Sequence, residues 1–293
     1  MSRPVFGDPR TDFIFQRVFG SEDHKPVLVG FLNDVLGLEG AHRVEEVSFL
    51  PPEQRPKVSE LKYSIVDVKC VDGRGVGHVV ELQVLNVEAF EKRVVYNVAK
   101  AYTNQLDVGD DYPEPNDVIG ISICDFMLWP PGEGAAVPML SQWRMQEQSS
   151  GVRGLPEMQF VFLELPKYDA TREPRTLVEK WAYFFREARN LTVIPPSLAH
   201  PPLVQALEAA RTAHFTKEEW DAYIAAGMAI QNERGALAMA RREPLRLGIE
   251  TTCRVLDIEI TPERRARLDS LRADELEALL VRLGEDRRWP VDG

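Results

Sequence analysis

The stretch that decides the fold is residues 78–84, HVVELQV, in which apolar and polar residues alternate. Three apolar side chains alternate with Glu81 and Gln83, and a period of two residues predicts a β-strand whose apolar face packs against a core. Glu81 and Gln83 then share the opposite face of this strand. A carboxylate and an amide on that face must contact water, a partner molecule or a metal ion.

A second β-rich run, residues 62–70 (KYSIVDVKC), precedes this strand, and a glycine-rich segment, residues 73–75 (GRG), lies between them. Two β-rich runs joined by a short glycine-rich segment predict a β-hairpin. The first run alternates as well, so that one face carries Ile65, Asp67 and Lys69 and the other carries Val66, Val68 and Cys70.

The length of the hairpin loop decides which residues face each other. A three-residue loop places Asp67 opposite Glu81 and Lys69 opposite Val79, because directly opposed residues of an antiparallel pair point to the same side. A two-residue loop would instead pair Asp67 with Val80 and turn Glu81 to the other face. The apolar alternation favours the three-residue loop, which is common when a glycine occupies the left-handed position.

Two opposed carboxylates destabilise a strand pair, so this arrangement predicts a metal site. Mg²⁺, or Mn²⁺ in its place, takes one or two carboxylates and completes its octahedron with water and phosphate oxygens. Such a metal activates water and stabilises charge at a phosphorus centre. The alternative is an ordinary solvated sheet surface, which is the usual explanation for polar residues on a strand face.

The rest of the chain divides into an α/β part and a helical part. Short helices are predicted within residues 11–38, a helix at 88–106, and apolar strands at 117–126 and 158–166. Beyond Tyr168 one helix follows another, and the proline-containing stretch 193–203 (VIPPSLAHPPL) predicts a boundary that divides the chain into residues 1–192 and 193–293.

Composition limits the function classes. The net charge of −11 disfavours a broad nucleic-acid-binding face, so contact with DNA would require a local basic patch. The three cysteines form no CxxC pair, and the five histidines show no metal-binding spacing. The sequence shows no export signal and no long apolar run, so we expect a cytoplasmic protein without a membrane span.

The helix that follows the HVVELQV strand is the best candidate for such a patch. Its residues Arg93, Tyr96, Asn97 and Lys100 are three, four and seven positions apart and therefore share one face. The opposite face is apolar and predicted to pack on the core. The other basic residues assigned to the patch are Lys62, Lys69, Arg74 and Lys92.

Together, these features resemble the PD-(D/E)XK nuclease family transposases, also described as recombination-promoting nucleases. The resembling stretches are TDFIFQRVFGSEDHKPVLVGFLNDVLGL, the hairpin with its following helix (residues 63–112), VIGISICDF, FLELPKY and LVEKWAYFF. They extend over roughly the first 190 residues, and their order in the chain is more specific than any one of them. The resemblance implies a restriction-endonuclease-like α/β core, a mixed sheet flanked by helices, over residues 1–192, with an α-helical extension at 193–293.

The resemblance also implies metal-dependent hydrolysis of DNA phosphodiesters. Asp67 and Glu81 match the metal-binding acids, and Gln83 stands where many relatives have a lysine. A glutamine amide offers only a neutral dipole where an ammonium group would stabilise negative charge. We therefore expect Gln83 to position water, and Lys100 is the candidate for supplying the missing charge.

Several alternatives stay open at this point. Lys69, Arg93, Tyr96 and Lys100 are candidate phosphate contacts, although the helix face alone is also typical of a solvated surface. Asp12 and Asp125 lie in matching segments, and His78 should point away from Glu81. The rival function is a non-catalytic interaction protein on a nuclease-like fold, and the C-terminal helices are candidates for homo-oligomer contacts.

Overall fold

The computed structural model describes residues 3–54, 64–106, 115–132 and 136–290. The chain forms two compact units, residues 1–226 and residues 227–293, which are described separately below. The predicted boundary at residue 193 therefore lies inside the first unit, where Leu198 and Leu203 belong to the buried core. The division into functional domains at that residue remains a prediction.

A six-stranded mixed sheet forms the centre of the first unit and confirms the predicted restriction-endonuclease-like α/β fold class. Its spatial order is β1-β4-β5-β6-β8-β7, in which β5, β6 and β8 run parallel and the other neighbours are antiparallel. The strands are β1 (Val47–Phe49), β4 (Val68–Asp72), β5 (Gly77–Gln83), β6 (Val118–Cys124), β7 (Leu140–Trp143) and β8 (Met158–Glu164). A separate two-stranded sheet pairs β2 (Glu53–Gln54) with β3 (Ser64–Ile65).

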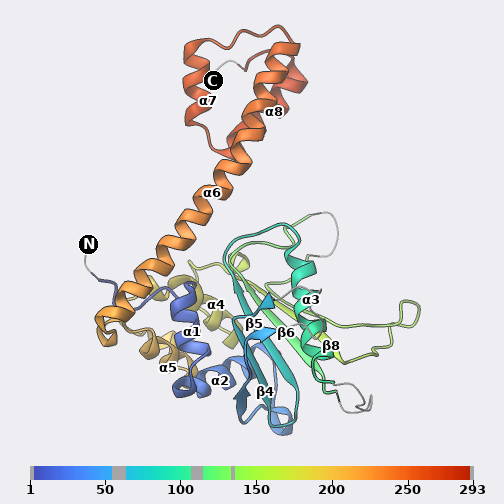
Figure 1. Cartoon of the computed structure of the whole chain (residues 1–293), viewed down its shortest axis with the longest axis vertical. Coiled ribbons are helices and arrows are strands. Elements are labelled where there is room, and N and C mark those ends of the chain that lie inside the picture. The colour runs from blue at the N-terminus through green and yellow to red at the C-terminus, as the bar shows by residue number, and fades with distance from the viewer. Residues whose placement is uncertain (1–2, 55–63, 107–114, 133–135, 291–293) are drawn as a thin grey trace. The chain divides into compact units, whose positions relative to one another are not determined.

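Helices cover both faces of the sheet, with α1, α2, α4 and α5 on one side and α3 on the other (Figure 1). Their bounds are α1 (Asp12–Phe19), α2 (Lys25–Leu36), α3 (Phe90–Thr103), α4 (Leu177–Glu187) and α5 (Pro201–Ala209). Local sequence fixes several ends: Thr11 caps α1, Gly37 ends α2 at φ 65°, and Thr176 with Glu179 forms a capping box on α4.

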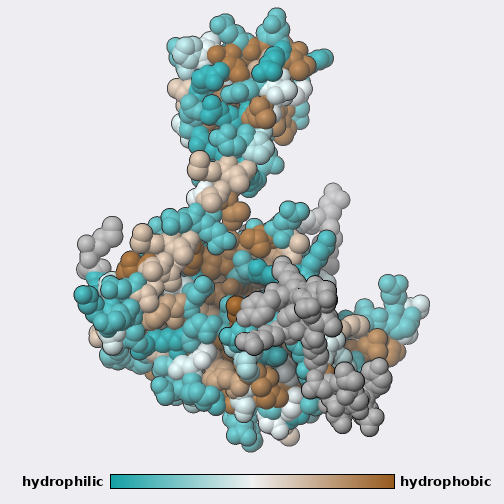
Figure 2. Space-filling model, viewed as in Figure 1, coloured by the Kyte–Doolittle hydropathy of each residue, from teal (hydrophilic) through white to brown (hydrophobic). Residues whose placement is uncertain are grey.

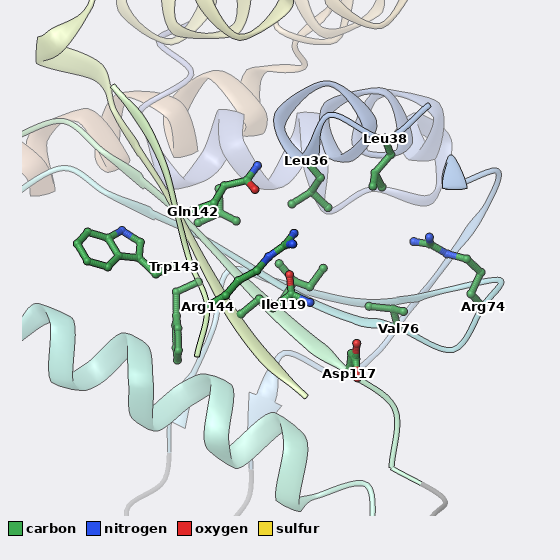
Figure 3. A pocket seen from close by; sticks show the side chains of 12 residues that line it. Leu36, Leu38, Arg74, Val76, Asp117, Ile119, Gln142, Trp143 and Arg144 are labelled. Atoms are coloured by element: carbon green, nitrogen blue, oxygen red, sulfur yellow. The ribbon is translucent and has the colours of Figure 1, made fainter. Parts of the chain in front are cut away.

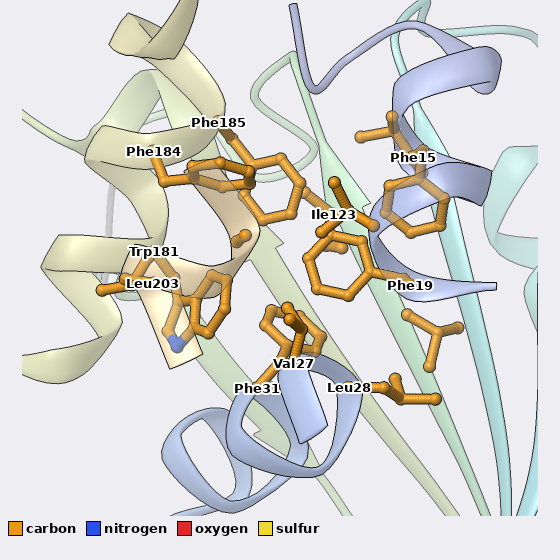
Figure 4. Close-up of a cluster of buried hydrophobic side chains, with 14 of the residues drawn as sticks. Phe15, Phe19, Val27, Leu28, Phe31, Ile123, Trp181, Phe184, Phe185 and Leu203 are labelled. Atoms are coloured by element: carbon orange, nitrogen blue, oxygen red, sulfur yellow. The ribbon is translucent and has the colours of Figure 1, made fainter. Parts of the chain in front are cut away.

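Aromatic side chains from α1, α2 and α4 form the main core beneath the sheet (Figure 4). Phe185 has no solvent exposure, and its ring centroid lies 5.3 to 6.4 Å from those of four other phenylalanines. Phe19 stacks on it at 5.8 Å. Aromatic pairs at these separations add to the free energy gained from burying apolar area, so this cluster fixes α1 against the sheet.

The β4–β5 hairpin has the predicted register. Lys69 pairs with Val79 and Val68 with Val80, and the paired residues end at Val68, directly after Asp67. The loop comprises three residues, and Gly75 occupies the left-handed region at φ 86°. The structure therefore confirms the predicted register of the hairpin, and the charge of Asp67 acts on Glu81 closely enough to raise the pKa of Glu81.

One detail of the predicted alternation is wrong. Val66 does not share a face with Val68 and Cys70, but packs with Val79 and Val98 under α3. The reason is a bend at Asp67, which separates β3 from β4. Sequence periodicity describes a continuous strand, and this run is interrupted.

Helix α3 lies unusually close to the sheet at one point. A Cβ atom added to Gly120 of β6 would lie 2.4 Å from a side-chain carbon of Val98 on α3. A glycine is therefore required at this position for the observed helix–sheet distance. This close approach brings the polar residues of α3 within reach of β5.

The second unit consists of helices. Helix α6 (Lys217–Val255) begins in the first unit and continues into the second, where α7 (Pro262–Ser270) and α8 (Ala273–Asp286) follow. Ile249, Cys253, Leu268 and Leu276 are at most 1% exposed and form its small core.

Hydrophilic side chains make up much of the visible surface, with hydrophobic ones interspersed (Figure 2). The three cysteines are free and buried. Among the described residues, no helix combines the length and the apolar character that crossing a membrane requires.

Candidate active site

Asp67 lies at the bend before β4, where one hydrogen bond holds its carboxylate and another holds its backbone carbonyl. Its Oδ2 accepts a bond of 2.7 Å from the backbone N–H of Leu82, and its backbone carbonyl accepts one of 2.6 Å from Nε2 of Gln16 on α1. Burial, together with the negative charge of Asp12, raises the pKa of this carboxyl to about 6, although the hydrogen bond from Leu82 and the charge of Arg93 act in the opposite direction.

Glu81 lies on β5 beside Asp67 and is 8% exposed. Its Oε1 accepts a hydrogen bond of 2.8 Å from Nδ2 of Asn97 on α3. Burial, followed by repulsion from Asp67, raises the pKa of the Glu81 carboxyl to about 7. The two carboxylates therefore resist carrying negative charge together in the absence of a cation.

Gln83 is the third polar residue of this face, and both ends of its amide are engaged. Arg93 of α3 donates a hydrogen bond to its Oε1, and its Nε2 donates one of 2.8 Å to the carbonyl of Leu85. Arg93 is exposed, and its positive charge lowers the pKa of both Asp67 and Glu81. A cation that contacts Gln83 is thus Arg93.

The predicted face of α3 exists, and it is directed toward the carboxylates. Asn97 and Lys100 are buried, Tyr96 is half-buried, and Nζ of Lys100 lies 5.4 Å from the centroid of the Tyr96 ring. Because Arg93 reaches Gln83 and Asn97 reaches Glu81, α3 runs antiparallel to β5, and Lys100 lies beyond Glu81 on the side away from Gln83. Lys69 is half-buried, and its burial lowers its pKa.

The remaining basic residues assigned to the patch have different positions. Lys92 is exposed on α3. Arg74 lies in the hairpin loop at the other end of β5, where it donates to Asp72 at 2.6 Å and to the carbonyl of His42 at 2.9 Å. Lys62 lies outside the described residues. His78 is fully buried against Asp72, at 3.1 Å, and takes no part in the site, as predicted.

Arg10, which the sequence pattern does not single out, lies near the site through its contact with Asp125. Arg10 donates to Asp8 at 3.0 Å and to Asp125 at 3.2 Å. The backbone N–H of Asp125 donates to the carbonyl of Gln83 at 2.9 Å. No local pattern distinguishes Arg10, because its partner Asp125 lies far along the chain. Asp12 is exposed at the start of α1, near Asp67.

The donor set suits a hard cation with few protein ligands. Two adjacent carboxylates each accept a hydrogen bond from a neutral donor, and both have raised pKa values that a divalent cation would lower. Among the described residues, no three acidic, histidine or cysteine side chains form a group that could hold a metal. Two carboxylates match the one or two protein ligands that Mg²⁺ usually takes, since this ion keeps several waters.

The structure also contains a pocket that is separate from these carboxylates (Figure 3). Arg74, Gln142, Trp143, Arg144 and Gln159 are among its lining residues. It lies where β6 and β8 begin, whereas Glu81 and Gln83 lie toward the end of β5. The lining of this pocket therefore includes none of the candidate residues Asp67, Glu81 and Gln83.

Without divalent metal, we expect the free energy of unfolding contributed by this pair to fall as the pH rises from about 4 to about 7. The folded state retains protons on Asp67 and Glu81 that the unfolded state has already released, so each rise in pH favours unfolding. Urea denaturation in EDTA, comparing the parent with an Asp67→Asn, Glu81→Gln double variant, isolates this slope. An equal pH dependence in both proteins would contradict the assignment.

Comparison with known families agrees with this geometry. The sequence model for the PD-(D/E)XK nuclease family transposase matches residues 9–239, a range that contains every candidate residue above. No curated protein and no solved structure matches the chain.

Proposed function

Because the chain belongs to the PD-(D/E)XK nuclease family transposases, we propose that it is a Mg²⁺-dependent endonuclease. It would hydrolyse DNA phosphodiesters. The observation that carries this proposal is the pair Asp67 and Glu81, two carboxylates with raised pKa values at the end of the β4–β5 hairpin, where the charge of Asp67 acts on Glu81. A link to recombination or mobile elements follows from the family alone. Strand transfer is not part of the proposal.

Asp67 and Glu81 would hold Mg²⁺ or Mn²⁺. When bound, the ion lowers the pKa of water and stabilises negative charge on the phosphate. The protein contributes the positions of the two carboxylates. The N–H of Leu82 holds one and the amide of Asn97 holds the other, so neither side chain needs to reorganise.

Gln83 would orient the attacking water. Its Oε1 accepts from Arg93 and its Nε2 donates to Leu85, which fixes the direction of the amide. Each of these atoms retains a second hydrogen-bonding position, since an amide oxygen has two lone pairs and an amide nitrogen has two hydrogens. A water bound there would be positioned without being deprotonated by Gln83.

Arg93 would supply the positive charge that relatives obtain from a lysine. Its guanidinium contacts Gln83 and acts electrostatically on both carboxylates. Being exposed, it can form a bidentate contact with a DNA phosphate. Lys69, Tyr96 and Lys100 remain proposed phosphate contacts around Glu81.

Plasmid cleavage tests this proposal directly. At low salt with Mg²⁺ or Mn²⁺, we expect the parent to nick or linearise supercoiled DNA, and we expect Asp67→Ala and Glu81→Ala to lose this activity, as EDTA removes it from the parent. Equal behaviour of all three proteins, with no binding of either metal by calorimetry, would instead support a non-catalytic interaction protein. That alternative draws on the net charge of −11 and on glutamine at position 83.

A further inference from the structure

We propose that Gln16 of α1 is a positioning residue for Asp67, so that α1 sets the metal affinity of the site without contacting the metal. This inference rests on the proposed function, because it assigns Gln16 a role toward the same metal. The observation is the hydrogen bond of 2.6 Å from Nε2 of Gln16 to the backbone carbonyl of Asp67.

Asp67 needs such support because it lies outside the strand ladder. β3 ends at Ile65 and β4 begins at Val68, so regular strand pairing does not fix the backbone of Asp67. Its carboxylate is held by Leu82 on one side, and its carbonyl by Gln16 on the other. Without the second bond, the residue could pivot about the first, and the carboxylate would lose its direction relative to Glu81.

The amide of Gln16 has Gly20 as its neighbour on the side of its oxygen. Its Oε1 lies against Gly20, where an added Cβ atom would approach to 2.3 Å. Helix α1, in turn, is anchored by four buried residues, Ile14, Phe15, Val18 and Phe19. The core therefore determines where α1 lies, and α1 determines where Asp67 lies.

Gln16 is exposed, which separates this role from general stabilisation. One exposed hydrogen bond contributes little to the free energy of unfolding. The orientation of a metal ligand is more sensitive, since removal of a supporting group typically lowers metal affinity about 10- to 100-fold. A positioning role thus predicts a large change in metal affinity with a small change in stability.

Mn²⁺ binding by calorimetry on the full chain tests the inference, with Gln16→Ala and Gln16→Glu as the variants. We expect both to bind Mn²⁺ about 10- to 100-fold more weakly than the parent, at an unchanged melting temperature. Gln16→Glu is the sharper of the two. Its extra negative charge would strengthen cation binding if only electrostatics mattered, but its carboxylate cannot donate to the Asp67 carbonyl.

Two further variants complete the experiment. Gly20→Ala displaces the amide of Gln16 while retaining the glutamine, so it should weaken Mn²⁺ binding in the same direction. Gln148→Ala, at an exposed glutamine in the connection between β7 and β8, is the matched control and should bind as the parent does.

Parent-like affinity in both Gln16 variants would overturn the inference, and so would a parent that binds no Mn²⁺. A parent that binds Mn²⁺ through Asp67 but cuts no plasmid would remove the proposed function alone. In that case the measured affinities of the Gln16 variants would still decide the positioning role.

Discussion

We expect Glu81→Gln to abolish DNA cleavage and, at the same time, to stabilise the metal-free protein above pH 7. The substitution removes a metal ligand, so activity should fall by at least about 100-fold. Glutamine retains the oxygen that accepts from Asn97, but it removes a charge that burial and Asp67 both disfavour. Because the pKa of Glu81 is raised from 4.5 to about 7, removing its charge should increase the free energy of unfolding above pH 7 by up to about 3 kcal/mol.

Plasmid cleavage with Mg²⁺ measures the first effect, and thermal unfolding in EDTA at pH 8 measures the second on the same preparation. Glu88→Gln, at an exposed position before α3, is the matched control and should change neither quantity. A loss of activity accompanied by a lower melting temperature would show that Glu81 is mainly a structural residue. Opposite signs for activity and stability are typical of a residue selected for function.

The largest expected effect on stability is that of Phe185→Ala, at about 3–5 kcal/mol of unfolding free energy. Phe185 is fully buried and contacts rings from α1, α2 and its own helix α4. Its truncation would leave a cavity that these rings cannot fill without moving. Because α1 rests on this cluster and carries Gln16, the variant should also bind Mn²⁺ more weakly at temperatures where it remains folded.

Urea denaturation measures this change, and Leu177→Ala is the control on the same helix. Leu177 is 39% exposed, so its truncation removes little buried area and should cost less than about 1 kcal/mol. A similar loss in both variants would mean that the aromatic cluster is not the part of the core that fixes α4 and α1.

The sequence was sufficient to predict the hairpin, its register and the polar face of α3. Strand alternation places Glu81 and Gln83 on one face of their strand. A three-residue loop gives the register in which Lys69 pairs with Val79, as observed. Helical spacing alone grouped Arg93 with Asn97. Each of these predictions depends on residues that are close together in the chain, where periodicity is a reliable guide.

The contacts that complete the site were not predictable in this way. Gln16 and Asp67 are 51 positions apart, and Arg10 and Asp125 are 115 apart. Only tertiary packing brings such pairs together. The position of Arg93 beside Gln83 has the same origin, because it depends on how α3 packs on the sheet.

The bend at Asp67 has an implication for how this site could change during evolution. The carboxylate of Asp67 accepts the N–H of Leu82, so this side chain takes the place of a backbone acceptor at the end of the β4–β5 pair. If the proposed catalysis were lost, Glu81 would no longer be needed as a metal ligand, and a glutamine could still accept from Asn97, whereas position 67 would still need an oxygen to satisfy a backbone donor. A lineage that abandoned cutting should therefore lose its acid at position 81 first and keep aspartate or asparagine at position 67.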